Sequence, residues 1–420
     1  MSRSAPRLRG GHHLLLLEGS QQLFPALIAA MDEARDEVRL ETYIFDFTGA
    51  GASVAEALIR AAERGVHVCL TVDGLGTGPI PAGWRARFAE AGVAWRVYSP
   101  VNAVALLLPT RWRRLHRKLC VVDGTLAFCG GINILDDFHD PTHGVLVAPR
   151  FDFAVRITGP LVAEVEETLA VLWRRLQAVR ALKQHDLQKA VQRLMAPLVL
   201  PPAEAGITLA GMTQAGVTQV GIPQTGGRHL ARAALVLRDN LRSRKRIERA
   251  YLRAIGAARA EIIIANAYFV PGFKLQRALV LAAERGVRVQ LLLQGKYEYF
   301  MQYHAARPVY GALLGADVQI FEYAPSFLHA KVAVIDGHWA TVGSSNLDPL
   351  SLLLAREANV VVDDTRFAGE LRARLCDAMG LAGQAVDAAR YARRPLRQRC
   401  MEYLAMLVMR LALLVSRQRY

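Results

Sequence analysis

The six-residue string AAERGV occurs twice in this chain, at residues 61–66 and again at 282–287. An apolar run precedes each copy, VRLETYIF at 38–45 and EIIIANAYF at 261–269, and another apolar run follows each copy directly. The order strand, helix, strand is typical of a parallel sheet that is covered by helices. The repetition therefore predicts two α/β halves that are related by duplication.

The length of 420 residues fits two domains of roughly 200 residues each. We expect an α/β fold in which each domain is a mostly parallel sheet flanked by helices, with the active site at the interface of the two domains. Between the halves, the pentapeptides AGMTQ, AGVTQ and VGIPQ follow one another without a charged residue, which is typical of a linker or surface loop. The predicted segments are a first domain (1–204), a linker (205–227), a second domain (228–385) and a basic amphipathic tail (386–420).

Composition excludes a disordered chain and indicates an anionic partner. Hydrophobic residues make up 52% and charged residues 21%, so a large core can form. The net charge of +15 would match a nucleic acid, an anionic membrane surface or a phosphate-bearing substrate. The five scattered cysteines lack a C-x-x-C pair and predict free thiols in a reducing compartment, without a zinc site. Because no apolar run reaches the roughly 20 residues of a spanning helix, we expect a cytoplasmic protein with peripheral membrane contact.

The residues that carry chemistry recur at matched positions of the two halves. The first half contains HRKLCVVD at 116–123, followed by GGIN at 130–133. The second half contains HAKVAVID at 329–336, followed by GSSN at 343–346. The histidine and the asparagine are 17 residues apart in both copies. Two copies of H-x-K-x4-D with the same G-x-x-N, at equivalent points of a repeat, are not accidental.

Strand geometry explains the spacing within this motif. In each copy the histidine and the lysine are two residues apart, so a strand places both side chains on one face. Asp123 and Asp336 fall on the other face, each directly before a glycine, where Asp-Gly favours a tight hairpin turn. We therefore expect a structural role for these two aspartates. The returning strand would bring G-x-x-N back beside the histidine and the lysine.

Two such half-sites that face each other would place two imidazoles, two ammonium groups and two carboxamides around one point, a set that matches a phosphodiester. One histidine, His116 or His329, would attack phosphorus while the other protonates the leaving oxygen. Histidine suits both tasks because it titrates near neutral pH. This scheme requires neither a metal nor a cofactor. The predicted phosphate-binding residues are Lys118, Lys331, Asn133, Asn346 and Ser344.

A histidine that acts as nucleophile usually needs a carboxylate on its other ring nitrogen. After each motif, one apolar run carries a lone acid, Asp152 in the first half and Glu357 in the second, and we expect these two to orient the histidines. The alternative is that both are ordinary acids at strand ends. Glu41 and its repeat partner Asn266 lie in apolar strands, where they would support the site from behind or serve as polar residues at the edge of the core. The segment DDFH at 136–139 predicts a solvated loop rather than a metal site.

The paired motifs resemble the signature of the phospholipase D superfamily. Further segments resemble its bacterial cardiolipin synthase branch of the B type: LETYIF at 40–45, DFAVRITGP at 152–160, ANAYFVPG at 265–272 and HWATVGSSNLDPLSL at 338–352. The resemblance runs from about residue 12 to 385, and the 205–227 linker lies outside it. It implies that a phosphatidyl group passes to a histidine and then to an alcohol, with His116 as nucleophile and His329 as acid and base. The superfamily also counts Asp123 and Asp336 with its catalytic motif.

The substrate class must come from outside the motif, because the superfamily also contains nucleases. The apolar run AVALLL at 103–108 leads into a cluster of arginines before His116, and 297–303 is an aromatic segment of the second half. Arginines at 393–399 precede the apolar tail. An apolar segment next to a cluster of arginines fits an anionic bilayer better than a nucleic acid. The alternative for each of these runs is that it packs in the protein core.

The resemblance implies a cardiolipin synthase that condenses two phosphatidylglycerols and releases glycerol. We expect it on the cytoplasmic side of the bacterial cell membrane, with no nucleic-acid partner. The alternatives are a hydrolytic phospholipase D or another lipid transferase, a nuclease, and a membrane binder without catalysis. Intact motifs in both halves argue against the last of these. The oligomeric state stays open.

Overall fold

The computed structural model describes residues 6–417 apart from 101–112, 141–142, most of 185–229, 240–242, 297–299, 349–354 and 383–384. The 103–108 run and the 205–227 linker lie outside the described residues. The elements of the first half are β1 (Arg9–Glu18), α1 (Gly19–Glu33), β2 (Glu37–Thr42), α2 (Gly49–Glu63), β3 (His67–Asp73), α3 (Ala82–Ala91), β4 (Ala94–Tyr98), β5 (Arg114–Leu115), β6 (Lys118–Val122), β7 (Leu126–Gly130), β8 (His139–Asp140), β9 (Gly144–Val145), β10 (Phe153–Thr158) and α5 (Leu161–Lys183).

Apart from β5, β8 and β9, which have no counterpart among its described elements, the second half repeats this order and then adds two helices. Its elements are β11 (Ala231–Arg238), α7 (Arg246–Ala257), β12 (Glu261–Asn266), α8 (Phe273–Glu284), β13 (Arg288–Gln294), α9 (Phe300–Leu314), β14 (Gln319–Tyr323), β15 (Lys331–Ile335), β16 (Trp339–Gly343), β17 (Ala355–Asp363), α11 (Thr365–Ala382), α12 (Ala388–Ala392) and α13 (Leu396–Arg417). The predicted duplication is confirmed by this repeated order of elements.

The two halves share one mixed sheet, in the order β14-β13-β12-β15-β16-β17-β11-β1-β10-β7-β6-β2-β3-β4. The strands of the βαβ units pair in parallel, β2 with β3 and β3 with β4, and likewise β12 with β13 and β13 with β14. The motif hairpins and the central strands pair antiparallel. The expectation of a mostly parallel sheet therefore holds only for the three outer strands of each half, because Asp-Gly hairpins reverse the chain in the inner part.

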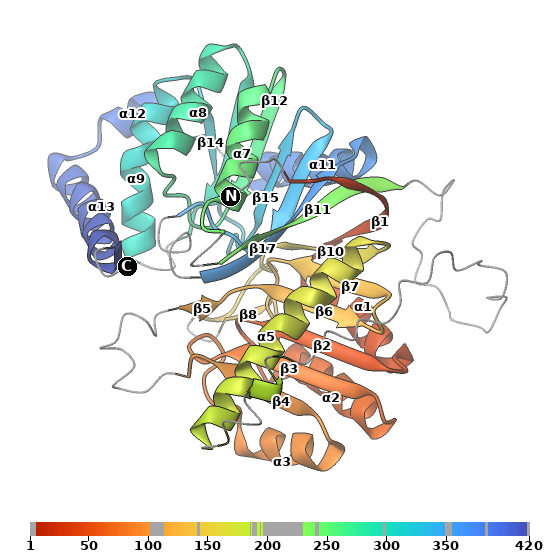
Figure 1. Cartoon of the computed structure of the whole chain (residues 1–420). Coiled ribbons are helices and arrows are strands. Elements are labelled where there is room, and N and C mark those ends of the chain that lie inside the picture. The colour runs from red at the N-terminus through yellow and green to blue at the C-terminus, as the bar shows by residue number, and fades with distance from the viewer. Residues whose placement is uncertain are drawn as a thin grey trace.

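Figure 1 shows α1, α2 and α3 beside the strands of the first half and α7, α8 and α9 beside those of the second half. Three large hydrophobic clusters hold these helices and strands together. One lies between the first half of the sheet and α1, α2 and α3, and a second lies between the other half and α7, α8 and α9. The third joins α5 and α11 to strands of both halves through residues such as Leu161, Leu235, Val332 and Leu371. This shared core fixes the two motif hairpins relative to each other, which a two-part site requires.

None of the helices that the structure describes is long and apolar enough to cross a bilayer. The first half ends with α5, a helix of 23 residues. The five cysteines are all free thiols, and Cys69, Cys120 and Cys129 are buried.

Candidate active site

Each motif histidine lies directly before a strand rather than inside it. β6 begins at Lys118, two residues after His116, and its register with β7 places Lys118 opposite Gly130. β15 begins at Lys331, two residues after His329, and pairs with β16 in the same way. In both halves the lysine Nζ donates to the carbonyl oxygen of its own motif histidine. The hairpin thus returns G-x-x-N beside the histidine and the lysine, as predicted.

The carboxylates contact the histidines across the two halves. His116 of the first half lies with Nδ1 3.1 Å from Glu357 Oε2 of the second half. His329 of the second half lies with Nδ1 2.6 Å from Asp152 Oδ2 of the first half. Both carboxylates are buried, with side chains 0% and 3% exposed. A carboxylate on Nδ1 fixes the ring and leaves Nε2 for chemistry, so each half supplies the orienting acid of the other.

Backbone hydrogen bonds reinforce the same crossing. The N–H of His116 donates to the carbonyl of Arg356 at 3.0 Å, the residue before Glu357. The N–H of His329 donates to the carbonyl of Phe151 at 2.9 Å, the residue before Asp152. Parallel bridges accompany both contacts, β5 with β17 in one case and 151 with 328 in the other. The interface of the halves is therefore built around the two histidines.

Four nitrogen-bearing side chains converge and repel one another when charged. Burial, together with Lys331, lowers the pKa of Lys118 to about 7. Burial lowers the pKa of His329 well below its ordinary value, and both motif lysines and His116 lower it further. Charged groups of one half thus shift the pKa values of groups in the other half, so the two lysines and two histidines lie close together. Such a cluster favours an anion with several oxygens.

The two histidine–carboxylate pairs differ in their surroundings. Burial raises the pKa of Asp152 to about 7, and Asp137 adds to this rise. Burial also acts to raise the pKa of Glu357, but His116, Lys118 and Arg238 outweigh it and lower the pKa. Glu357 is consequently ionised at neutral pH, whereas Asp152 titrates there.

The two carboxylates also differ in their neighbour from G-x-x-N, which is Gly131 beside Asp152 and Ser344 beside Glu357. A Cβ atom on Gly131 would lie 2.4 Å from Asp152 Oδ1, so only glycine fits beside that carboxylate. In the second half Ser344 takes this place, and its Oγ–H donates to Glu357 Oε2 at 2.5 Å. Its backbone N–H donates to the carbonyl of Ala358 at 3.0 Å. Both donors of Ser344 are thus engaged within the protein and its hydroxyl supports the carboxylate, while its predicted phosphate-binding role stays a prediction.

The asparagines and their neighbours brace the motif segments. Asn133 Oδ1 accepts the N–H of Ile44 at 3.2 Å, so the carboxamide oxygen is engaged and a contact to phosphate would have to come from the amide N–H groups. Asn346 is buried, 3% exposed. Glu41 binds Arg117, the residue between His116 and Lys118, at 2.8 Å.

Asn266, the repeat partner of Glu41, accepts the N–H of Leu347, directly after Asn346, at 3.2 Å. Glu41 and Asn266 thus hold the two motifs from behind, which was one of the two predicted roles.

Asp123 and Asp336 turn away from the histidines. Each lies in the left-handed region, with φ of 50°, at the tip of its motif hairpin. Asp123 accepts the N–H groups of residues 35–37, and Asp336 accepts those of residues 259–261, all at 2.8–2.9 Å. Both aspartates therefore fasten the motif hairpin to the start of the neighbouring strand, in agreement with the structural role expected for them.

Two residues of the site were missed from the sequence. The ring of Tyr43 lies 4.8 Å from that of His116, and Lys118 Nζ lies 5.5 Å from the same tyrosine ring. Arg238 is buried and is the register partner of Glu357 across β11 and β17. The only signal for Tyr43 was its position two residues after Glu41 in the apolar LETYIF run. No local pattern marks Arg238.

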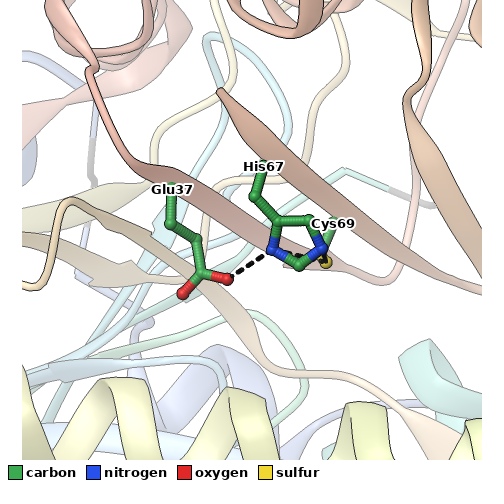
Figure 2. A group of neighbouring side chains, drawn as sticks. All are labelled: Glu37, His67 and Cys69. Carbon is green, nitrogen blue, oxygen red and sulfur yellow. Dashed lines mark hydrogen bonds and ion pairs between the residues drawn. The ribbon is translucent and has the colours of Figure 1, made fainter. Parts of the chain in front are cut away.

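Two other polar groups lie outside this site. The expectation of a solvated loop at 136–139 is wrong for Asp137, which is 3% exposed and accepts the N–H of Ser20. Glu37, His67 and Cys69 lie together on β2 and β3 (Figure 2), with His67 Nδ1 2.8 Å from Glu37 Oε1.

Arg39 bonds both carboxylate oxygens of Glu37 and satisfies its charge. We therefore read the group of Glu37, His67 and Cys69 as an ion-pair network on the sheet surface.

Comparisons with known proteins agree with this geometry. The family described as "Cardiolipin synthase, PLD-like domain" matches residues 27–144 and 251–378, one stretch in each half. Cardiolipin synthase B of Escherichia coli K12 is 37% identical over 380 residues, which cover 90% of this chain and 83% of the relative. Cardiolipin synthase A of Klebsiella pneumoniae strain 342 is 30% identical over 400 residues, 94% of this chain and 74% of the relative.

A solved structure shares the fold at low identity. The phosphatidylserine synthase of Haemophilus influenzae Rd KW20 has a TM-score of 0.66 and 12% identity, covering 97% of this chain and 95% of its own. The two matched halves and the crossed pairs define a phospholipase D-like architecture. The chain belongs to the cardiolipin synthase family within it.

Proposed function

We propose that this chain transfers a phosphatidyl group from one phosphatidylglycerol to a hydroxyl of a second one, forming cardiolipin and releasing glycerol. The crossed pairs His116–Glu357 and His329–Asp152 carry this proposal, because they join two half-motifs into one site for a single phosphodiester. Family membership supports the choice of a phospholipid over a nucleic acid as substrate.

In the first step Nε2 of His116 attacks phosphorus, and the bond from phosphorus to the glycerol oxygen breaks. His329 gives its proton to that oxygen, and glycerol leaves. In the second step a hydroxyl oxygen of the other phosphatidylglycerol attacks phosphorus, His329 takes its proton, and the bond between phosphorus and His116 breaks. Two easier displacements replace one difficult one. The assignment of His116 as nucleophile rests on the family resemblance.

The phosphate is held by the lysine and asparagine pairs in this scheme. Lys118 and Lys331 neutralise the non-bridging oxygens, and Asn133 and Asn346 donate amide hydrogens to them. An incoming phosphodiester anion offsets the repulsion that lowers the pKa of Lys118 and His329 in the empty site. Ligand binding thus favours the imidazolium that the first step needs.

Parallel incubation with labelled phosphatidylglycerol, phosphatidylethanolamine and single-stranded DNA tests this function. The proposal predicts cardiolipin and glycerol from phosphatidylglycerol alone, with a rate that a chelator leaves largely unchanged. Phosphatidic acid as the sole lipid product would make the chain a hydrolase. Cleaved DNA would make it a nuclease, and a rate that a chelator abolishes and a divalent metal restores would contradict the scheme. The site would work at the cytoplasmic face of the membrane, where phosphatidylglycerol supplies an anionic surface.

A further inference from the structure

We infer that the outer face of α13 is a docking surface for an anionic lipid bilayer and that it brings the active site to that bilayer. This inference rests on the proposed function and deepens it by naming the surface that meets the substrate-bearing membrane. α13 is the last helix of the chain, and Figure 1 shows it lying against α9 at the edge of the second half.

One stripe of α13 faces the protein. Ala405 is buried with Ala305 of α9 and with Val270, and Met406 packs against the same cluster. Glu402 is 1% exposed and binds Arg394 at 2.5 Å. The inner face is therefore anchored by packing and by a buried ion pair.

The opposite face is apolar and exposed. Six large apolar side chains are open to solvent there: Leu396 (74%), Met401 (37%), Tyr403 (53%), Leu404 (59%), Leu407 (51%) and Val408 (46%). At about 100° per residue, their mean direction lies opposite the stripe of Glu402, Ala405 and Met406. A contiguous apolar face of this kind marks an interaction site.

Charge identifies an anionic bilayer as the occupant. Within residues 396–408 the one acidic residue is Glu402, and it is buried, whereas Arg397 and Arg399 are exposed. Arg397 lies within the apolar face at its N-terminal end and Arg399 lies at its border, and an apolar helix face with arginines of this kind is typical of helices in the membrane interface. A second copy of this chain would fit less well, because its face would carry the same excess of positive charge and the whole chain has a net charge of +15.

The position of α13 connects this face to the active site. The N–H of Val270, which α13 covers, donates to the carbonyl of Leu347 at 3.1 Å. Leu347 follows Asn346 of the second motif directly. A bilayer on the outer face of α13 is therefore separated by about one helix diameter, about 10 Å, from the segment that leads to the proposed phosphate-binding asparagine.

The experiment measures co-sedimentation with vesicles of phosphatidylcholine and phosphatidylglycerol at about 0.1 M and about 1 M salt, where the Debye length is about 10 Å and about 3 Å. The variant Leu404→Ser/Leu407→Ser/Val408→Ser should lose at least about tenfold in binding at high salt, because apolar insertion does not depend on salt. The control Val179→Ser/Leu182→Ser removes two equally exposed side chains (50% and 47%) from α5 and should bind like the wild type. The variant Arg397→Gln/Arg399→Gln should lose about tenfold at low salt and little at high salt.

Equal binding of the α13 serine variant and the wild type would overturn the inference, as would an equal loss in the α5 control. If the wild type is a dimer, the α13 serine variant is a monomer and both bind vesicles equally, the face is instead a contact with a second copy. Thermal unfolding checks that each variant folds. Cardiolipin formation in detergent micelles tests the proposed function separately, and it should change less than about twofold in the α13 serine variant, because no bilayer is present.

Discussion

Nδ1 of His329, in the second half of the chain, lies 2.6 Å from Oδ2 of Asp152, in the first half. The equivalent contact in the opposite direction joins His116 to Glu357 at 3.1 Å. Neither half can orient its own histidine in this arrangement. The duplicated chain therefore forms one active site and not two.

Double-mutant cycles should detect this crossing. His116→Ala and Glu357→Gln should each lower kcat/KM by about 10³-fold or more, and the double variant should be little worse than His116→Ala alone, because the acid acts through that ring. The same-half pair His116→Ala with Asp152→Asn should lose activity further. Additive losses for His116 with Glu357, together with coupling between His116 and Asp152, would show that the orienting contacts are misassigned.

Asp336→Asn should affect stability far more than chemistry. Partial burial acts to raise the pKa of Asp336, but three backbone N–H donors outweigh it and lower the pKa. Because the folded-state pKa is depressed, this stabilisation is present above the unfolded pKa of about 4 and is lost as the pH falls through the folded value.

Thermal unfolding near neutral pH should show a loss of about 1–3 kcal/mol in Asp336→Asn, with kcat of the folded enzyme nearly unchanged. Asparagine tolerates the left-handed backbone, so the turn itself should survive. A variant that is fully stable but inactive would place Asp336 in the catalytic machinery.

Sequence periodicity and the repeat were enough to predict the duplication, the motif hairpins and the two orienting acids. These are local features that recur at fixed spacing, so one copy supports the other. The crossing of Asp152 and Glu357 was not predictable, because it depends on how the shared core places the halves. The role of Arg238 depends on the register of β11 with β17, and the antiparallel centre of the sheet depends on how hairpins join the βαβ strands.

Arg238→Met should raise the pKa of the Glu357 carboxyl while leaving both motif histidines in place. Arg238 is the cross-strand partner of Glu357 and helps to lower its pKa. Loss of this charge should raise the pKa of Glu357 and move the acid limb of the kcat/KM profile to higher pH. Arg238→Lys should restore most of the profile because it keeps the charge. An unchanged profile in a folded Arg238→Met variant would contradict this role.

The pH profile of kcat/KM should have an alkaline limb at which Lys118 loses its proton. Burial and Lys331 lower the pKa of Lys118 to about 7, so the ammonium is present below that pH and is lost as the pH rises through it. The profile of kcat/KM reports groups of the free enzyme, so it should begin to fall as His329, whose pKa lies well below its ordinary value, loses its proton, and a second alkaline limb should follow near pH 7 as Lys118 loses its proton. Lys118→Arg should move that limb upwards, since arginine stays charged, at some loss of rate. If this limb stays in place in Lys118→Arg, it belongs to another group that must be protonated, such as His329.

Isolation of the covalent intermediate tests the central claim most directly. Wild-type protein would be mixed with phosphatidylglycerol labelled with ³²P, quenched with alkali within its first turnovers and digested, because phosphohistidine survives base. The account predicts labelled phosphate on His116, absent from His116→Ala and formed slowly in His329→Ala. Label on His329 would reverse the two roles, and cardiolipin production without any labelled histidine would contradict the two-step transfer.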